Sequence, residues 1–278
     1  MTRLKKTAKK IKFWKYQSEG NDFVMVHDVP RSKLQNAQIV RRLCDRVLGI
    51  GADGAIFLEK NKKGWQWNFF NEDGSTPKMC GNGAKCTAAW LRRHGDKRAK
   101  SWSWQTKLGT ARGEAGRGDL MWVRWPMPSS APDRSIVVEL GEILEGLNER
   151  GLAYLAFIDT GIPHLVLVNH ESWTDTDRST VNEQLRHHRA FGKAGTNVTW
   201  HSLGTGASVT FERGVEGETL ACGTGAIAIH RALEDMGRGK KESQLQFPGG
   251  KLFVKRDAAG ELWLGGAPAE VFSGELTL

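Results

Sequence analysis

The sequence predicts an α+β (mixed α/β) fold of two pseudo-symmetric halves, each a strand-rich wrap around a central buried helix. A Cys-Gly-polar-Gly-Ala motif occurs twice, at residues 80–84 and 222–226, about half a chain length apart. Each copy leads into a helical run that is apolar on nearly every side, and such a helix is expected to be buried. Elsewhere apolar and polar residues alternate with a period of two between short Gly, Asn or Asp turns. This pattern favours antiparallel or mixed sheet over doubly wound βαβ units.

Strands are predicted where the period-two alternation persists. In the first half they cover residues 22–28, 54–60, 65–70, 101–106, 120–125 and 136–140. In the second half they cover residues 152–158, 165–169, 197–203, 208–212, 244–247, 251–255 and 261–264.

Four helices are predicted. The two buried ones follow the cysteine motifs, over residues 83–93 and 225–236. A third is expected over residues 37–48, ending at Gly49 as a left-handed cap. A fourth is expected over residues 182–190, with Asn182 as its N-cap.

A boundary between the halves is predicted at residues 126–132, the densest Pro/Ser stretch of the chain. Residues 1–130 then form an N-terminal half that carries the first cysteine motif. Residues 131–278 form a C-terminal half that carries the second.

The chain is basic, with 40 Lys and Arg against 31 Asp and Glu, a net charge of +9 and a pI of about 9.5. The positive residues are dispersed and accompany no nucleic-acid-binding motif. A surface that favours anionic substrates is therefore the preferred interpretation, and a nucleic-acid-binding protein is the alternative.

Residues 1–12 are rich in Lys and Arg, and no apolar run of a signal peptide follows them. We interpret them as a frayed basic arm before the first strand, with targeting or nucleic-acid contact as the second interpretation. No apolar run approaches the roughly 18 residues of a membrane span. The expected location is the cytoplasm.

The four cysteines, at positions 44, 80, 86 and 222, are expected to be free thiols. Their spacing fits no metal site. Cys44 and Cys86 lie within predicted helices among apolar residues, which indicates a packing role. Cys80 and Cys222 each stand just before a helix, where unpaired N–H groups and the helix dipole favour a thiolate.

Two such thiols, one per half, suggest a pair that face each other across a cleft. A small carboxylate held by both helix starts would have its α-carbon between the sulfur atoms. One thiolate could then remove the α-proton while the opposite thiol donates a proton to the other face, which inverts the stereocentre. A phosphate cradle is the alternative for such Gly-rich turns, but neither turn matches a known phosphate-binding pattern.

Several motifs, in their order along nearly the whole chain, resemble the diaminopimelate epimerase family. They are Gly20-Asn21-Asp22-Phe23, Gly51-Ala52-Asp53-Gly54, residues 70–75, Met79-Cys80-Gly81-Asn82-Gly83, Pro163-His164, Glu212-Arg213-Gly214, residues 218–225 and Pro248-Gly249-Gly250. The resemblance implies a cofactor-independent epimerase that interconverts L,L- and meso-diaminopimelate. It also implies two similar α/β halves with the active site between them, and a last strand, within residues 267–278, that packs on the N-terminal half.

The resemblance also implies roles for individual residues. Cys80 and Cys222 match the two acid/base cysteines. Substrate contacts are implied for Asn21, Asn71, Asn197, Glu212 and Arg213, and backbone donors to the α-carboxylate for Gly81, Asn82, Gly223 and Thr224. His164 and Glu212 match residues near the thiols. The expected ligand is a small amino acid, without metal, cofactor, nucleic acid or membrane, and a homodimer is left open.

Each substrate residue also has an alternative interpretation. Asn21 and Asn71 lie in turn sequences, His164 starts a strand, and Glu212–Arg213 would suit a surface ion pair. Family members often carry Asn where this chain has Ile162, some carry Gln in place of Gly54, and many have one residue fewer between Gly214 and Glu218. These departures motivate a second enzyme hypothesis, a related two-cysteine racemase of another amino acid such as histidine.

Overall fold

The computed structural model describes residues 10–27, 36–126, 128–171 and 173–277. Residues 1–9 of the basic arm, Asp28 of the first predicted strand and Met127 of the Pro/Ser stretch lie outside them. The chain forms two compact units. Unit 1 comprises Met1–Met121 and Ala267–Leu278, and unit 2 comprises Trp122–Gly266. Within the described ranges, no helix has both the length and the apolar character that crossing a membrane requires.

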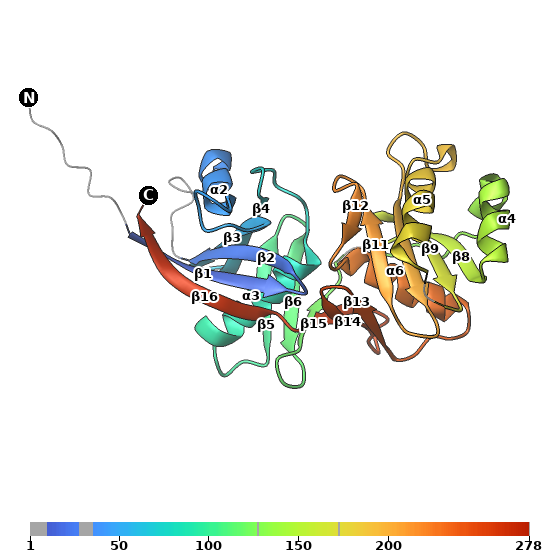
Figure 1. Ribbon diagram of the computed structural model, residues 1–278. Coiled ribbons are helices and arrows are strands. Elements are labelled where there is room, and N and C mark those ends of the chain that lie inside the picture. The colour runs from blue at the N-terminus through green and yellow to red at the C-terminus, as the bar shows by residue number, and fades with distance from the viewer. Residues whose placement is uncertain (1–9, 28–35, 127, 172, 278) are drawn as a thin grey trace, which may run out of the picture. The chain divides into compact units, whose positions relative to one another are not determined.

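Unit 1 is built on strands in the order β6-β5-β4-β3-β2-β1-β16 (Figure 1). Their bounds are β1 (Lys10–Ser18), β2 (Asn21–His27), β3 (Gly54–Asn61), β4 (Gly64–Asn71), β5 (Ser101–Thr106), β6 (Gly109–Ala115) and β16 (Ala269–Thr277). The β2–β3 and β4–β5 pairs are parallel and the other described pairs of this unit are antiparallel, so the predicted mixed sheet is confirmed. β7 (Met121–Arg124) follows β6 along the chain and contains the point in the sequence where unit 1 ends and unit 2 begins.

Strand β1 corrects the prediction of a basic arm that extends to Lys12. Lys10 and Lys12 are exposed, whereas Ile11 and Phe13 are 4% and 7% exposed. The lysines thus occupy the outward positions of an ordinary strand, whose side chains alternate between the two faces. Along its length β1 pairs with the C-terminal strand β16.

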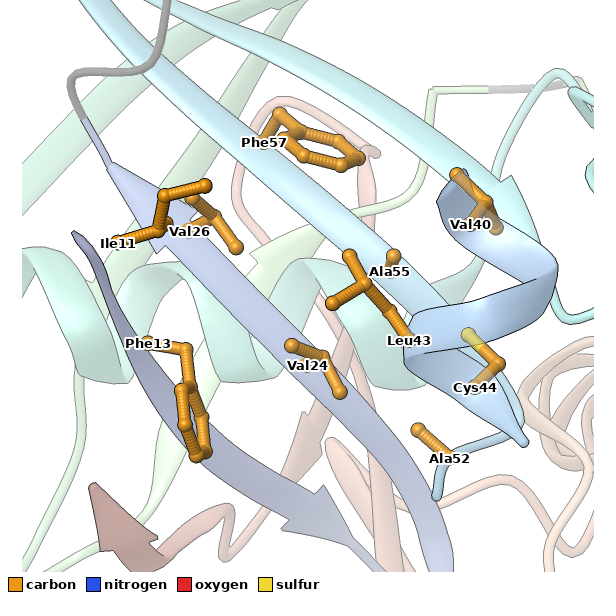
Figure 2. Packing of buried hydrophobic residues seen from close by; sticks show 10 residues of the cluster. All are labelled: Ile11, Phe13, Val24, Val26, Val40, Leu43, Cys44, Ala52, Ala55 and Phe57. Atoms are coloured by element: carbon orange, nitrogen blue, oxygen red, sulfur yellow. The ribbon is translucent and has the colours of Figure 1, made fainter. Parts of the chain in front are cut away.

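Helix α2 (Ala37–Cys44) covers one face of β1–β3. Its buried side chains Val40, Leu43 and Cys44 join a cluster with residues of these strands (Figure 2). The helix ends earlier than predicted, because the Asp45 carboxylate accepts the backbone N–H groups of Val47 and Leu48 and turns the chain. The expected left-handed cap at Gly49 is wrong, since the first glycine with positive φ after the helix is Gly51.

The central helix of unit 1 is α3 (Gly81–His94), which contacts β1, β2, β5, β6 and β16. Ala84, Cys86, Ala88, Trp90 and Leu91 along it are at most 1% exposed. The predicted buried helix after the first cysteine motif is confirmed, and it begins two residues earlier than expected.

Unit 2 contains a five-stranded sheet in the order β12-β11-β10-β9-β8, and β13, β14 and β15 are adjacent to one another. Their bounds are β8 (Leu152–Asp159), β9 (Pro163–Asn169), β10 (Asn197–Ser202), β11 (Ser208–Glu212), β12 (Gly217–Thr219), β13 (Glu242–Phe247), β14 (Gly250–Arg256) and β15 (Leu262–Gly266). The second central helix, α6 (Gly223–Asp235), contacts strands of both groups. Its residues 226–229 are 0% exposed, so this buried helix is also confirmed.

Three local predictions in unit 2 are wrong. The segment predicted as a strand over residues 136–140 is a 3-10 helix, η1 (Ser135–Leu140), and the unpredicted α4 (Glu142–Glu149) follows it. The predicted helix at 182–190 is instead α5 (Asp175–Arg186), with the short η2 (Arg189–Phe191) after it. Thr174 caps α5 by accepting the Asp177 N–H, whereas the buried Asn182 accepts a hydrogen bond from Trp200 Nε1. A contact between distant segments thus explains the asparagine better than a cap does.

Candidate functional site

Cys80 and Cys222 have the same local geometry in the two units. Each has extended backbone angles (φ −141°, ψ 117° and φ −121°, ψ 109°) and is the N-cap residue of its central helix. Each Sγ lies 3.4 Å from the backbone N–H of the third helical residue, Gly83 or Gly225. Both thiols therefore lie where the positive end of a helix dipole stabilises negative charge on sulfur.

The glycines of the two motifs allow this close packing. A Cβ at Gly225 would lie 2.4 Å from Thr210 Oγ1 and 3.4 Å from Cys222 Sγ. At Gly83 it would lie 3.2 Å from Ile56 Cδ1. Only a residue without a side chain fits both positions without displacing its neighbours.

In unit 1, Asn21 and Asn82 lie beside Cys80. The Asn21 Oδ1 is 3.7 Å from Cys80 Sγ and accepts a hydrogen bond from Asn82 Nδ2 at 3.3 Å. Asn82 is 6% exposed, and its Oδ1 has no hydrogen-bond partner among the described residues. A buried, unpaired acceptor of this kind is suited to an ammonium or another donor on a ligand.

A network of charged side chains holds the Asn21 amide in place. Asp53 Oδ2 accepts the Asn21 Nδ2–H at 2.6 Å, and Arg46 bridges Asp53 and Asp22 at 2.7 and 3.0 Å. Lys15 Nζ lies 2.6 Å from Asp22. Burial would raise the pKa of Asp22, but hydrogen bonds from Arg46 and Lys15 outweigh it and lower this pKa to about 2. Asp22 is therefore ionised at neutral pH, which keeps the network paired.

Asn71 lies at the end of β4, directly opposite Gly54 of β3. Its Nδ2 donates to Ser75 Oγ at 2.9 Å. Gly54 is tightly surrounded, because a Cβ there would lie 2.6 Å from the Phe70 carbonyl oxygen and 2.8 Å from the Phe69 ring. A glutamine at this position would not fit this packing.

In unit 2, Cys222 is buried beside Thr224, Thr210 and Glu212. Its Sγ lies 3.2 Å from Thr224 Oγ1. Burial and then the Glu212 charge raise the pKa of the Cys222 thiol, whereas hydrogen bonds with Thr224, Gly225 N–H and Thr210 lower it. Burial also raises the pKa of Glu212, although hydrogen bonds with Thr219 and Cys222 oppose this shift. Burial thus favours the protonated form of both the thiol and the carboxyl group.

His164, Asn197 and Arg213 form one connected group. The Asn197 Oδ1 accepts the Arg213 backbone N–H at 2.9 Å, so its Nδ2 faces His164 Nε2 at 3.5 Å. His164 Nε2 is therefore the acceptor, and Nδ1 carries the proton donated to Thr199 Oγ1 at 2.8 Å. Burial, and then the Arg213 charge, lower the pKa of His164 to about 3. The imidazole is neutral throughout the physiological range.

The structure thus places the predicted residues in two groups. Cys80, Asn21 and Asn82 are together in unit 1, and Cys222, Thr224, Glu212, His164, Asn197 and Arg213 are together in unit 2. Asn71 also lies in unit 1, but its described side-chain hydrogen bond goes to Ser75 and not to the first group. Gly81 and Gly223 are the first residues of the two central helices. Sequence reasoning missed Asp53, Thr199 and Thr210. Asp53 belongs to a recognised motif, whereas only the β10–β11 register brings the two threonines opposite each other.

Comparisons with known proteins point to one family. A sequence model described as "Diaminopimelate epimerase" matches residues 13–115 and 156–268. The diaminopimelate epimerase of Aquifex aeolicus is 32% identical over 285 residues, covering 96% of this chain and 98% of that protein. The diaminopimelate epimerase of Desulforudis audaxviator is 34% identical over 284 residues, covering 95% and 99%.

Solved structures share the fold at low sequence identity. A putative phenazine biosynthesis PhzC/PhzF protein from Clostridium difficile has a TM-score of 0.69 at 15% identity, covering 96% of this chain and 100% of that one. A hydroxyproline epimerase from Agrobacterium vitis has a TM-score of 0.59 at 13% identity, covering 100% and 94%. These likenesses confirm the mixed α/β fold class.

Proposed function

The chain belongs to the diaminopimelate epimerase family and is an isomerase, and on that premise we propose that it interconverts L,L- and meso-diaminopimelate. The proposed reaction is two-base proton transfer at the α-carbon between a thiolate and a thiol. One observation carries it: Cys80 and Cys222 are both N-cap residues of buried helices, with the same 3.4 Å approach of a helical N–H to sulfur.

The first step breaks the Cα–H bond, and the proton goes to one cysteine thiolate. The electron pair left on the α-carbon is delocalised into the carboxylate, whose developing charge the helical N–H groups of Gly81, Asn82, Gly223 and Thr224 stabilise. The other cysteine then gives its thiol proton to the opposite face. The product is the epimer, and the two sulfur atoms have exchanged protonation states.

The remaining residues are proposed to hold the substrate. Asn82 Oδ1, a buried acceptor, suits the α-ammonium group. Asn21 and Asn71 belong to the same unit and are proposed to contact the substrate as well. In the other unit Asn197 and Glu212 supply further polar contacts. Arg213 suits the distal carboxylate, because a guanidinium can donate two parallel hydrogen bonds to it. Neutral His164 is proposed to influence the Cys222 thiol through the hydroxyl groups of Thr199 and Thr210.

The experiment that tests this proposal is α-proton exchange in D₂O, followed by NMR over a panel of amino acids that includes L,L-diaminopimelate. We expect deuterium incorporation and epimerisation with diaminopimelate. Cys80→Ala and Cys222→Ala should each abolish racemisation in both directions, because each direction needs a base and an acid. Turnover that survives in either variant would exclude the two-base scheme.

No cofactor takes part in the proposed reaction. Full activity is expected after dialysis against a chelator, and no pyridoxal absorbance should be visible. Both thiols must stay reduced, so we also propose a cytoplasmic location, where disulfides are rare.

A second candidate is a racemase of another amino acid such as histidine. Gly54 motivates this candidate, because some family members carry Gln at this position. Here the carbonyl of Phe70 and the ring of Phe69 exclude any side chain, so the chain cannot make a contact that such a Gln would make. Arg213→Lys discriminates between the candidates. It should raise KM for diaminopimelate sharply if the arginine grips a distal carboxylate, and an unchanged KM would favour the second candidate.

A further inference from the structure

The orientation of one amide sets the surroundings of the Cys80 sulfur. The Asn21 Nδ2 lies 2.6 Å from Asp53 Oδ2. A carboxylate only accepts hydrogen bonds, so this end of the amide must be its NH₂ group. The carbonyl end is therefore the one that faces Cys80 Sγ, at 3.7 Å, and Asn82 Nδ2, at 3.3 Å.

Asp53 is itself held firmly. Its Oδ1 accepts from Arg46 at 2.7 Å, and its Oδ2 also accepts the Asp22 backbone N–H at 3.1 Å. In return its own backbone N–H donates to Asp22 Oδ1 at 2.9 Å. These reciprocal bonds join the starts of the parallel strands β2 and β3. The carboxylate that selects the Asn21 orientation thus has little freedom to turn.

The carbonyl of Asn21 favours the protonated form of Cys80. A thiol can donate to this oxygen, whereas a thiolate would face a partial negative charge without a proton between them. The Gly83 N–H, at 3.4 Å, acts in the opposite sense. The network beside Asn21 contains the charged side chains of Asp22, Asp53, Arg46 and Lys15, and the Glu19–Lys85 pair lies at the helix itself. The exposed Lys78 precedes Cys80 by two residues.

We propose that Asp53 is a positioning residue that, through Asn21, holds Cys80 as the thiol when no substrate is bound. The importance of this thiol for catalysis rests on the proposed function. The protonation state of Cys80 in the substrate-free protein can be tested without measuring turnover.

The test is the pH dependence of iodoacetamide alkylation at Cys80, measured by peptide mass spectrometry in a full-length Cys222→Ala background. Cys44 and Cys86 are 2% and 0% exposed and provide slow internal references. Asp53→Asn replaces an obligate acceptor with an amide that also donates, so Asn21 becomes free to turn its NH₂ group toward sulfur. We expect Cys80 alkylation at neutral pH to accelerate about tenfold, as a pKa lower by one unit implies.

Asp22→Asn is the matched control. It removes the same charge from the same network. The Asp22 side chain bonds to Arg46, Lys15 and the Asp53 backbone N–H, and none of its described hydrogen bonds goes to the Asn21 amide. We expect its effect on Cys80 alkylation to stay within about twofold. An unchanged rate in Asp53→Asn, or an equal acceleration in both variants, would overturn the proposal, because the second result would assign the effect to charge alone.

A second variant keeps the test decisive if Asp53→Asn does not fold. Asn21→Ala removes the carbonyl directly and leaves the bonds of Asp53 to Arg46 and Asp22 in place, so it should accelerate alkylation to a similar extent. No acceleration there would also overturn the proposal. These readouts are independent of substrate, so a wild-type protein that fails to exchange the α-proton of diaminopimelate refutes the proposed function without affecting them.

Discussion

The side-chain hydroxyls of Thr199 and Thr210 lie 3.1 Å apart and connect His164 to Cys222. The two threonines face each other in the antiparallel β10–β11 pair. The His164 Nδ1–H is donated to Thr199, and Thr210 in turn hydrogen bonds with the Cys222 thiol and lowers its pKa. A row of buried hydroxyls thus runs from a neutral imidazole to the sulfur.

Replacing Thr210 tests whether this row supports the Cys222 thiolate. Thr210→Val keeps the shape of the side chain but removes the hydroxyl, so the pKa of the Cys222 thiol should rise. We expect kcat to fall about tenfold, in line with the cost of one hydrogen bond to a charged group. The alkylation pH profile of Cys222 should shift upward. Thr210→Ser retains the hydroxyl and should stay near wild type; equal losses in both variants would contradict this role.

The close packing around Gly225 predicts that a side chain at this position strongly reduces activity. Gly225→Ala puts a methyl group 2.4 Å from Thr210 Oγ1 and 3.4 Å from Cys222 Sγ. The hydroxyl and the thiol must move apart, and we expect kcat/KM to fall at least 100-fold while circular dichroism shows a folded protein. Gly217→Ala is the control, because nothing lies within 4 Å of the added carbon. Comparable activity in the two variants would show that the close packing is unimportant.

Stability should depend on pH through His164. Its pKa is lowered to about 3 in the folded protein, whereas an unfolded histidine titrates near about 6.5. Between these values the unfolded state binds one more proton, so the free energy of unfolding falls as the pH falls, by up to about 1.4 kcal/mol per unit. From pH 7 to pH 5 the wild type should lose about 2 kcal/mol more than His164→Asn.

Urea denaturation at both pH values measures this difference. His170→Asn, at an exposed position, should show the wild-type pH dependence. A variant at position 164 that retains the full wild-type dependence would mean that His164 is not the group responsible.

Removing one partner of the buried ion pair between Lys85 and Glu19 should strongly destabilise the protein. Lys85 is 0% exposed within α3, and Glu19 also accepts the Ala267 N–H at 2.8 Å. Lys85→Met leaves a buried carboxylate unpaired and should cost about 3–5 kcal/mol in urea denaturation. Lys10→Met, which breaks an exposed pair with Glu275, should cost less than about 1 kcal/mol.

The double variant Lys85→Met/Glu19→Gln checks the cause of that loss. It removes both charges, so most of the lost stability should return. If the double variant is less stable than Lys85→Met, the cost lies in the packing of the lysine stem rather than in the unpaired carboxylate.

The sequence alone determined the features that arise from local pattern. The two central helices were predicted because each follows a Cys-Gly-polar-Gly-Ala motif and is apolar on nearly every side. Most strands were predicted from their alternation. The cysteines and their polar neighbours were recognised because the motifs are short and contiguous.

Tertiary structure decided what depends on partners far apart in the chain. Asn182 looked like a helix cap but is buried by its bond with Trp200, and residues 136–140 alternate like a strand yet form a 3-10 helix. Asp53 reaches Asn21 across the β2–β3 pair, and the register of β10 and β11 sets Thr199 against Thr210. A hydrogen bond requires correct distance and direction, and for such pairs only the folded chain supplies both.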